Sequence, residues 1–201
     1  MSSTLLFREG SSHTFSISGL TTSAPSTTVN FGYPTIMPST IAPCLWFDGQ
    51  AEEAATFYTS FFKGGKVIST QYYGEAGKST HGHDPGTVMM VTFELNGLSF
   101  SALNGGPQFK FSEAISLQIM CEDQAEVDYY WNKLAEGGDP AKQNCGWVTD
   151  KFGVSWQVIP KALNDMITDP DPKKTQRTFE ALLAMKKLDI AALKDAYEGR
   201  G

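Results

Sequence analysis

The chain of 201 residues has few cysteines, fewer basic than acidic residues and no long apolar run. Its three cysteines, Cys44, Cys121 and Cys145, are odd in number and form no C-x-x-C pair, which argues for a reducing, intracellular setting. With 16 Lys and Arg against 22 Asp and Glu, and no basic stripe, we expect no nucleic-acid partner. No apolar segment approaches the roughly 18–20 residues that span a bilayer, so we expect no membrane partner.

Charge is also scarce in residues 1–38, which are rich in Ser and Thr and carry only Arg8 and Glu9. A mitochondrial presequence is one interpretation, but such peptides are usually rich in arginine. We predict a disordered tail and a cytoplasmic protein, with a mitochondrial location as the alternative.

Hydrophobic periodicity predicts regular structure from Ile41 onward. The first half has the pattern of a strand, a helix, a second strand and a hairpin, at residues 41–47, 48–62, 66–73 and 87–104. The second half has the pattern of a strand, a helix and a hairpin, at residues 114–120, 121–138 and 146–160. The chain after Pro160 is predicted to be helical.

The two halves are similar in sequence. DGQAE at 48–52 aligns with EDQAE 74 residues later, and NGLSFSAL at 96–103 aligns with FGVSWQVI 56 residues later. We assign the extra length of the first half to the loop around His81 and His83. The repeat predicts an α+β fold of two βαβββ modules. We place a duplicated domain at 39–163, with modules of about 39–108 and 111–163, and C-terminal helices at 164–198.

The Gly105-Gly106-Pro107 turn allows two interpretations. Glycine N–H groups after a strand can hold a phosphate, or the turn can be a plain connection. Because it lies between the two repeats, within residues 105–113, we favour a seam that joins the modules.

Four segments resemble the PhnB-like group of the vicinal oxygen chelate superfamily, which includes glyoxalase I and bleomycin-resistance proteins. They are CLWFDGQAEEAATFY, FELNGLSFSALNGGPQFKF, CGWVTDKFGVSWQVIP and DPDPKKTQRTFEALLAMKKLDIAALKDAY. The resemblance implies cupped mixed β-sheets, C-terminal helices and a homodimer. The group is often labelled 3-demethylubiquinone-9 3-methyltransferase domain. A Rossmann-type methyltransferase needs a strand, a Gly-rich turn and a helix, and we find no such pattern, so we do not expect that activity.

Metal-dependent relatives in this superfamily place His and Glu ligands on strands of both modules. The matching positions here hold Cys44, Ser101, Ser116 and Gln157. Neutral hydroxyl and amide groups bind divalent metals poorly, so we predict no metal and no cofactor.

His81, His83 and Asp84 have a spacing that can bind zinc, but a solvated loop is the favoured interpretation. A thiol dyad of Cys145 with one of these histidines is a further alternative.

Aromatic and neutral polar side chains are predicted to line the cup. The candidate ligand-binding residues are Trp46, Phe100, Ser101, Asn104, Phe109, Phe111, Ser116, Trp147, Trp156 and Gln157. For the aromatic residues, and for Phe100 and Trp156 above all, core packing is the alternative. Glu94 and Glu113 are the nearest carboxylates for acid–base work, although a surface role is favoured, and Asp150-Lys151 is assigned to turn chemistry.

Three functions remain open from the sequence. We favour a metal-independent homodimer that binds a small apolar or aromatic molecule. A metal-free isomerase, lyase or cyclase is the alternative, and a protein with a filled core and no site is the third. A pocket beside Trp46 and Gln157 would support the first two, and whether the protein is an enzyme stays open.

Overall fold

The structure of the protein is a computed structural model that describes residues 41–200. The predicted tail, and with it the presequence alternative, lies outside the described residues. No helix within 41–200 combines the length and the apolar character that crossing a membrane requires.

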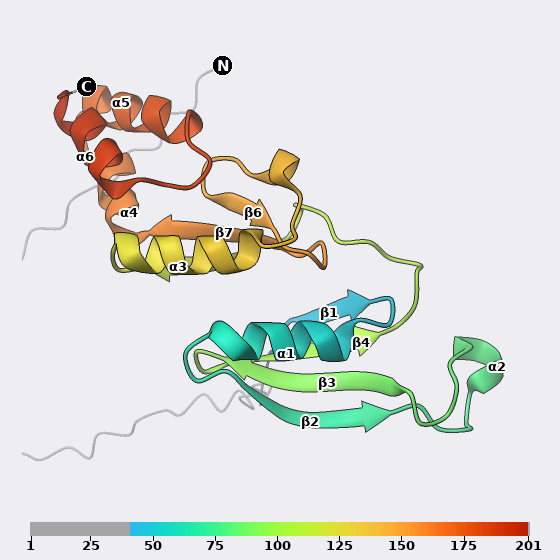
Figure 1. Ribbon diagram of the computed structural model, residues 1–201. Helices are drawn as coiled ribbons and strands as arrows, with labels where there is room; N and C mark the ends of the chain where they lie inside the picture. The colour runs from blue at the N-terminus through green and yellow to red at the C-terminus, as the bar shows by residue number, and fades with distance from the viewer. Residues whose placement is uncertain (1–40, 201) are drawn as a thin grey trace, which may run out of the picture. The chain divides into compact units, whose positions relative to one another are not determined.

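The first module is a four-stranded sheet covered on one face by a helix (Figure 1). The strand order is β1-β4-β3-β2, with β1 parallel to β4 and the other pairs antiparallel. The Asn96-Gly97 turn between β3 and β4 has positive φ at both residues, 47° and 83°, as a two-residue hairpin requires. The elements are β1 (Cys44–Phe47), α1 (Ala51–Phe61), β2 (Lys66–Tyr72), α2 (Lys78–His81), β3 (Val88–Leu95) and β4 (Leu98–Asn104).

Helix α1 covers one face of this sheet, because small and aromatic residues recur on one side of the helix. The buried residues of α1 are Ala51, Ala54, Ala55, Tyr58 and Phe61. On β4, Phe100 and Ala102 are buried on the same side as α1, whereas Ser101 and Leu103 alternate onto the opposite face. We call that opposite, half-exposed side the open face of the first sheet.

The second module has the same order of helix and paired strands but one strand fewer. Its sheet has the order β5-β7-β6, with β5 parallel to β7. Where the first module has β2, the second has only the 3-10 turn η1, because the segment after α3 contains Gly137, Gly138 and Pro140 and lacks strand-forming residues. The extra length of the first half is therefore β2 together with the histidine loop. The elements are β5 (Leu117–Cys121), α3 (Gln124–Ala135), η1 (Pro140–Lys142), β6 (Trp147–Thr149) and β7 (Ser155–Pro160).

Strand pairing confirms the register of the duplication. Cys44 pairs with Ser101 in the first sheet, and Gln118 pairs with Gln157 in the second. These four residues are related by the two offsets found in the sequence, so the α+β fold with two repeated mixed sheets is confirmed. The expectation that Ser116 holds the position of Gln118 was wrong, because Ser116 precedes β5.

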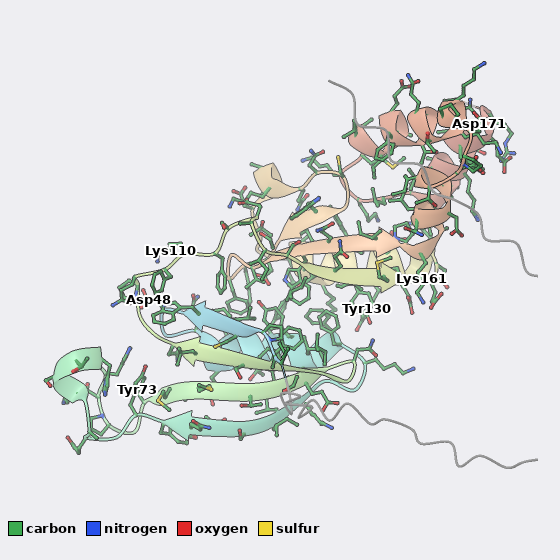
Figure 2. The ribbon with its side chains drawn as sticks, turned by 180° about the vertical axis from the view of Figure 1, so that it is seen from behind. Asp48, Tyr73, Lys110, Tyr130, Lys161 and Asp171 are labelled. Carbon is green, nitrogen blue, oxygen red and sulfur yellow. The ribbon has the colours of Figure 1, made fainter. Side chains whose placement is uncertain are left out.

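The two modules share one hydrophobic core, which lies between the helix-covered sides of both sheets. Tyr58 of α1 packs against Trp156 of β7 with ring centroids 5.3 Å apart, and Phe62 stacks on Tyr130 of α3 at 5.1 Å. Figure 2 labels Tyr130 where the modules meet. The open faces of the two sheets are therefore not part of this shared core.

Three C-terminal helices follow β7 directly and have their own small core. They are α4 (Lys161–Ile167), α5 (Pro172–Leu183) and α6 (Ile190–Glu198), and Leu163, Met166, Leu188 and Leu193 are buried among them.

The segment 184–189, which we call the strap, connects α5 to α6 and fastens these helices to the second module. The side chain of Gln124 accepts from Ile190 N at 2.8 Å and donates to Leu188 O at 3.1 Å. The N–H groups of Cys145 and Gly146 donate to the carbonyls of Met185 and Lys186, both at 2.8 Å.

Candidate functional site

The open face of the first sheet carries three rows of side chains that cross the strands. The register of the strand pairs places four hydroxyl and thiol groups in the middle row, which we call the hydroxyl row: Cys44, Ser101, Thr92 and Ser69. Two residues further along each strand is the apolar row, with Trp46, Leu103 and Met90 beside Gln71. On the other side lies the charged row of Ser99, Glu94 and Lys66. Sequence reasoning found Trp46 and Ser101 but missed Thr92, Leu103 and Met90.

The indole of Trp46 is held by the segment that joins the modules. Its Nε1 donates to Gly106 O at 2.8 Å, and the exposed ring of Phe109 meets it edge-on at 5.0 Å. A Cβ at Gly105 would come within 2.2 Å of Trp46 Cζ2, so only glycine allows the indole to lie on the backbone there.

The backbone N–H groups of the glycine pair already have a hydrogen-bond acceptor within the fold. The N–H groups of Gly105 and Gly106 both donate to Phe47 O, at 3.0 and 3.3 Å. Neither donor is free for a phosphate, which agrees with the seam interpretation. Lys110, labelled in Figure 2, lies in the same connecting segment.

The open face of the second sheet carries an amide row at the position that repeats the hydroxyl row. Trp147, Gln157 and Gln118 lie side by side across β6, β7 and β5. The amide of Gln157 donates to Ser116 Oγ at 2.7 Å and accepts from Gln118 Nε2 at 3.3 Å. The neighbouring row, Ile159 and Met120, is apolar as in the first sheet. Ile159 packs against the core of the C-terminal helices, whereas Met120 is exposed.

Three aromatic candidates pack in the shared core instead. Phe100 and Trp156, which the repeat relates, are only 4% and 2% exposed. Phe111 is half-buried, with its ring 5.2 Å from that of Phe47. Core packing, the alternative interpretation for Phe100 and Trp156, describes the contacts of all three.

Asn104 is buried at the end of β4 and its amide is used by the backbone. Its Oδ1 accepts from Ala51 N at 2.9 Å, and its Nδ2 donates to Val88 O at 3.0 Å. The acceptor satisfies one of the unpaired N–H groups at the start of α1, which has no capping side chain of its own at Gln50. The side chain of Asn104 therefore ties α1 to both central strands.

Asp150 is a buried carboxylate that sequence reasoning assigned to turn chemistry alone. It does close the β6–β7 turn, and it also accepts from Tyr58 OH at 2.7 Å and Trp156 Nε1 at 2.8 Å, together with the N–H groups of Phe152 and Val154. Burial raises the pKa of Asp150 while these hydrogen bonds act against the rise. Burial and the nearby carboxylate raise the pKa of Tyr58 as well. The signal in the sequence was the buried indole of Trp156, whose N–H needs an acceptor.

The histidine loop forms a stacked cluster beside α2, where Figure 2 labels Tyr73. The rings of His81 and His83 lie 4.5 and 4.4 Å from that of Tyr73. His81 Nδ1 accepts from His83 N at 3.1 Å, and its Nε2 donates to Ala76 O at 3.2 Å. Both ring nitrogens of His81 are thus engaged, and no group of three His, Cys, Asp or Glu residues within 41–200 is arranged to hold a metal ion.

The remaining reactive candidates lie in surface pairs. Glu94 pairs with Lys66 at 3.3 Å and Glu113 with Lys142 at 3.0 Å. The hydrogen bond from Lys142 holds the pKa of Glu113 below its usual range, which suits an ion pair better than a proton acceptor. The thiol of Cys145 lies 3.3 Å from Asn144 Oδ1.

A groove of about 850 Å³ lies between the modules, beside the free edge of β5. Its lining includes Phe62, Phe100 and Trp156 together with Lys161, which Figure 2 labels. Ser116 and Gln118 line this groove, but Trp46 and Gln157 do not. The lining includes Gln118 and Met120 of the second open face and no residue of the three rows of the first. This groove is therefore not the pocket expected beside Trp46 and Gln157.

Comparison with known proteins identifies the family. The family model described as 3-demethylubiquinone-9 3-methyltransferase matches residues 39–159. The chain belongs to this family, the PhnB-like branch of the vicinal oxygen chelate superfamily. The solved PhnB protein of Bacillus cereus is 37% identical over 60% of this chain and 98% of that protein, with a TM-score of 0.51. No protein with a curated description matched.

Two further solved structures are similar to this PhnB-like chain at lower identity. A Pseudomonas aeruginosa protein is 23% identical, covering 61% of this chain and 97% of that one, with a TM-score of 0.47. The fosfomycin resistance protein FosX of Listeria monocytogenes, described as complexed with manganese(II), is 17% identical, covering 61% and 93%, with a TM-score of 0.40. The family match ends at residue 159, so α4, α5 and α6 lie beyond it.

The residues of this chain fit neither a divalent metal ion nor a methyl-donor cofactor. A divalent ion in the central rows would meet no imidazole and no carboxylate, but only the thiol of Cys44, the hydroxyl of Ser101 and the amide of Gln157. S-adenosylmethionine would need a Gly-rich turn between a strand and a helix, whereas the Gly105-Gly106 turn leads to β5 and its N–H groups are already bonded.

Proposed function

We propose that this PhnB-like protein is a metal-independent small-molecule-binding protein whose ligand lies against the open faces of the two sheets. The observation that carries the proposal is the repeated arrangement of these faces. In each, a row of neutral hydrogen-bonding groups, centred on Ser101 or Gln157, lies beside an apolar row. Such a mixture of apolar walls and a few polar groups is typical of small-molecule sites.

The same proposal includes a homodimer. The groove of a single chain includes neither Trp46 nor Gln157, and a cup over these residues needs two open faces opposite each other. A second copy can bring its second sheet over the first sheet of its partner, and twofold symmetry then completes two equivalent cups.

Catalysis has no separate support among the described residues. The two carboxylates considered for acid–base chemistry, Glu94 and Glu113, are both paired with lysines at the surface. Binding without turnover is therefore the function that the geometry supports best.

Native mass spectrometry of the protein purified from its own source tests this function. We expect a dimer of the 21.9 kDa chain, carrying a retained organic molecule and no stoichiometric zinc, nickel, iron or manganese. A metal bound in a fixed ratio at the strand positions would overturn the metal-independent proposal.

A pair of variants tests the dimer. Met120→Lys puts a charge in the apolar row of the second open face, where Met120 is 44% exposed, and should shift the protein to the monomer. Ile68→Lys changes a residue of the edge strand β2 that is somewhat more exposed, at 53%, and should leave the dimer intact. If both variants remain dimeric, the open faces are not the interface.

A further inference from the structure

The open faces also indicate which kind of molecule would bind, and this inference rests on the function proposed above. On both sheets the chemistry changes in the same direction along the strands. The hydroxyl row leads to the apolar row of Leu103 and Trp46. The amide row leads to the exposed Met120 and to Ile159, which the C-terminal helices partly cover. Because the repeat relates the two faces, their polar and apolar ends correspond.

The charged side chains in the rows of the first open face form an ion pair with each other. Lys66 Nζ lies 3.3 Å from Glu94 Oε2 in the charged row, and the hydroxyl and apolar rows contain no Asp, Glu, Lys, Arg or His. The amide row of the second face is uncharged as well. An ionised ligand would lose hydration there without gaining a counter-charge, which is costly.

The polar rows can both donate and accept hydrogen bonds. Serine and threonine hydroxyls do so by rotation, and a glutamine amide has a donor and an acceptor end. Neighbouring rows on one face are two residues apart along a strand, or about 6.7 Å. A ring system of that length reaches from Ser101 to the row of Leu103 and Trp46.

We propose that the ligand is a neutral aromatic molecule with a hydroxyl or carbonyl group on one edge. The polar edge faces the hydroxyl row and the amide row, and the ring system lies against the apolar rows. Trp46 offers an aromatic surface there, and Phe109 next to it extends this surface.

Three naphthyl probes that differ only in their polar edge test this inference on the full-length protein. They are 2-naphthol, which is neutral and carries a hydroxyl, naphthalene, which has no polar group, and 2-naphthoate, which is an anion. Fluorescence titration should give 2-naphthol the lowest Kd, by about three- to tenfold, the difference that one neutral hydrogen bond makes. Ser101→Ala should remove this advantage and leave naphthalene binding unchanged.

Controls make each outcome decisive. Ser60→Ala, at an exposed hydroxyl of α1 that bonds only Phe57 O, should change nothing. Thr92→Val, isosteric and in the same row, repeats the test if Ser101→Ala folds poorly. Tighter binding of 2-naphthoate, equal binding of all three probes, or an advantage that survives both row variants would overturn the inference while leaving the binding function standing. If none of the probes binds saturably, the proposed binding function fails as well.

Discussion

Four donors converge on the carboxylate of Asp150, which is only 3% exposed. Asp150→Asn replaces one acceptor oxygen by an amide that must face donors. We expect the variant to lose about 2–4 kcal/mol of unfolding free energy, the cost of leaving buried donors without an acceptor. Urea denaturation measures the loss. As a control, Tyr58→Phe keeps the ring and removes one donor, and should cost about 1–2 kcal/mol. A loss below about 1 kcal/mol in Asp150→Asn would contradict the role given to this carboxylate.

The pH dependence of stability follows from the same group. Burial is the largest influence on Asp150 and raises its pKa in the folded state. The folded protein then holds this proton more tightly than the unfolded chain, so the contribution of Asp150 is fully present below about pH 4 and is lost as the pH rises through the folded-state pKa.

The stability gap between wild type and Asp150→Asn should therefore narrow with rising pH, measured by urea unfolding at a series of pH values. A gap that widens would mean that the four hydrogen bonds outweigh burial and hold the carboxylate ionised.

At the residue scale, sequence reasoning succeeded where the repeat constrained it. The alignment of Ser101 with Gln157 and of Phe100 with Trp156 predicted which residues lie on the same face of each sheet. The strand register agrees with that prediction. It did not reveal that Asn104 caps α1, because that contact joins residues 53 positions apart. A contact between residues so far apart in the chain leaves no pattern in the local sequence.

Among the elements, the strap is fastened to α3 through one side chain. Gln124→Ala removes both hydrogen bonds that this amide makes to the strap and to α6, and should cost about 1–2 kcal/mol. We also expect faster amide hydrogen exchange in residues 185–198, since these helices lose a fastening point.

Gln176→Ala serves as the matched control, because that exposed amide bonds only Glu180 within α5. Its effect should stay within about 0.5 kcal/mol. If exchange in 185–198 is unchanged in Gln124→Ala, the strap is held by the Cys145-Gly146 contacts instead.

The predictions of individual helices and turns were accurate where a few neighbouring residues determine the cap or the turn. Asp123 and Glu126 have the spacing of a capping box, and Asp123 accepts from Glu126 N at 2.9 Å, although Glu126 bonds Glu122 N and not the cap residue itself. The absent fourth strand of the second module was missed, because the repeat was assumed to be complete. The run of Gly137, Gly138 and Pro140 was the available signal against a strand there.

For the whole molecule, Cys121 is a reporter of global unfolding. It is fully buried in the core that both modules share, and burial raises its pKa to about 12. With a thiol-specific disulfide reagent at pH 8, we expect Cys121 to react only at the rate at which the whole domain opens, and later than Cys44, which is exposed in a single chain.

In a Cys121→Ser variant the slow phase of the reaction should disappear, which would assign that phase to Cys121. Reaction of Cys121 as fast as that of Cys44 would mean that the second module opens on its own.

At this scale the sequence predicted the family and the fold, because four motifs in order and an internal repeat leave few alternatives. It could not predict that the open faces lie outside the core that the two modules share. That arrangement depends on Tyr58 and Phe62 of α1 packing against Trp156 and Tyr130 of the other module, which no local pattern encodes.

The missing strand of the second module also bears on self-association into fibres. An unpaired sheet edge is a template for adding strands from other chains, and natural proteins keep such edges short or irregular. The edge at β6 is three residues long, and the strap binds the turn before it. The edge at β2 is seven residues long with exposed Val67 and Tyr72, and two register shifts and Lys66 interrupt it. The loss of one strand therefore gives the second module a shorter outer edge at β6, whereas β2 presents a longer row of unpaired backbone groups to other chains.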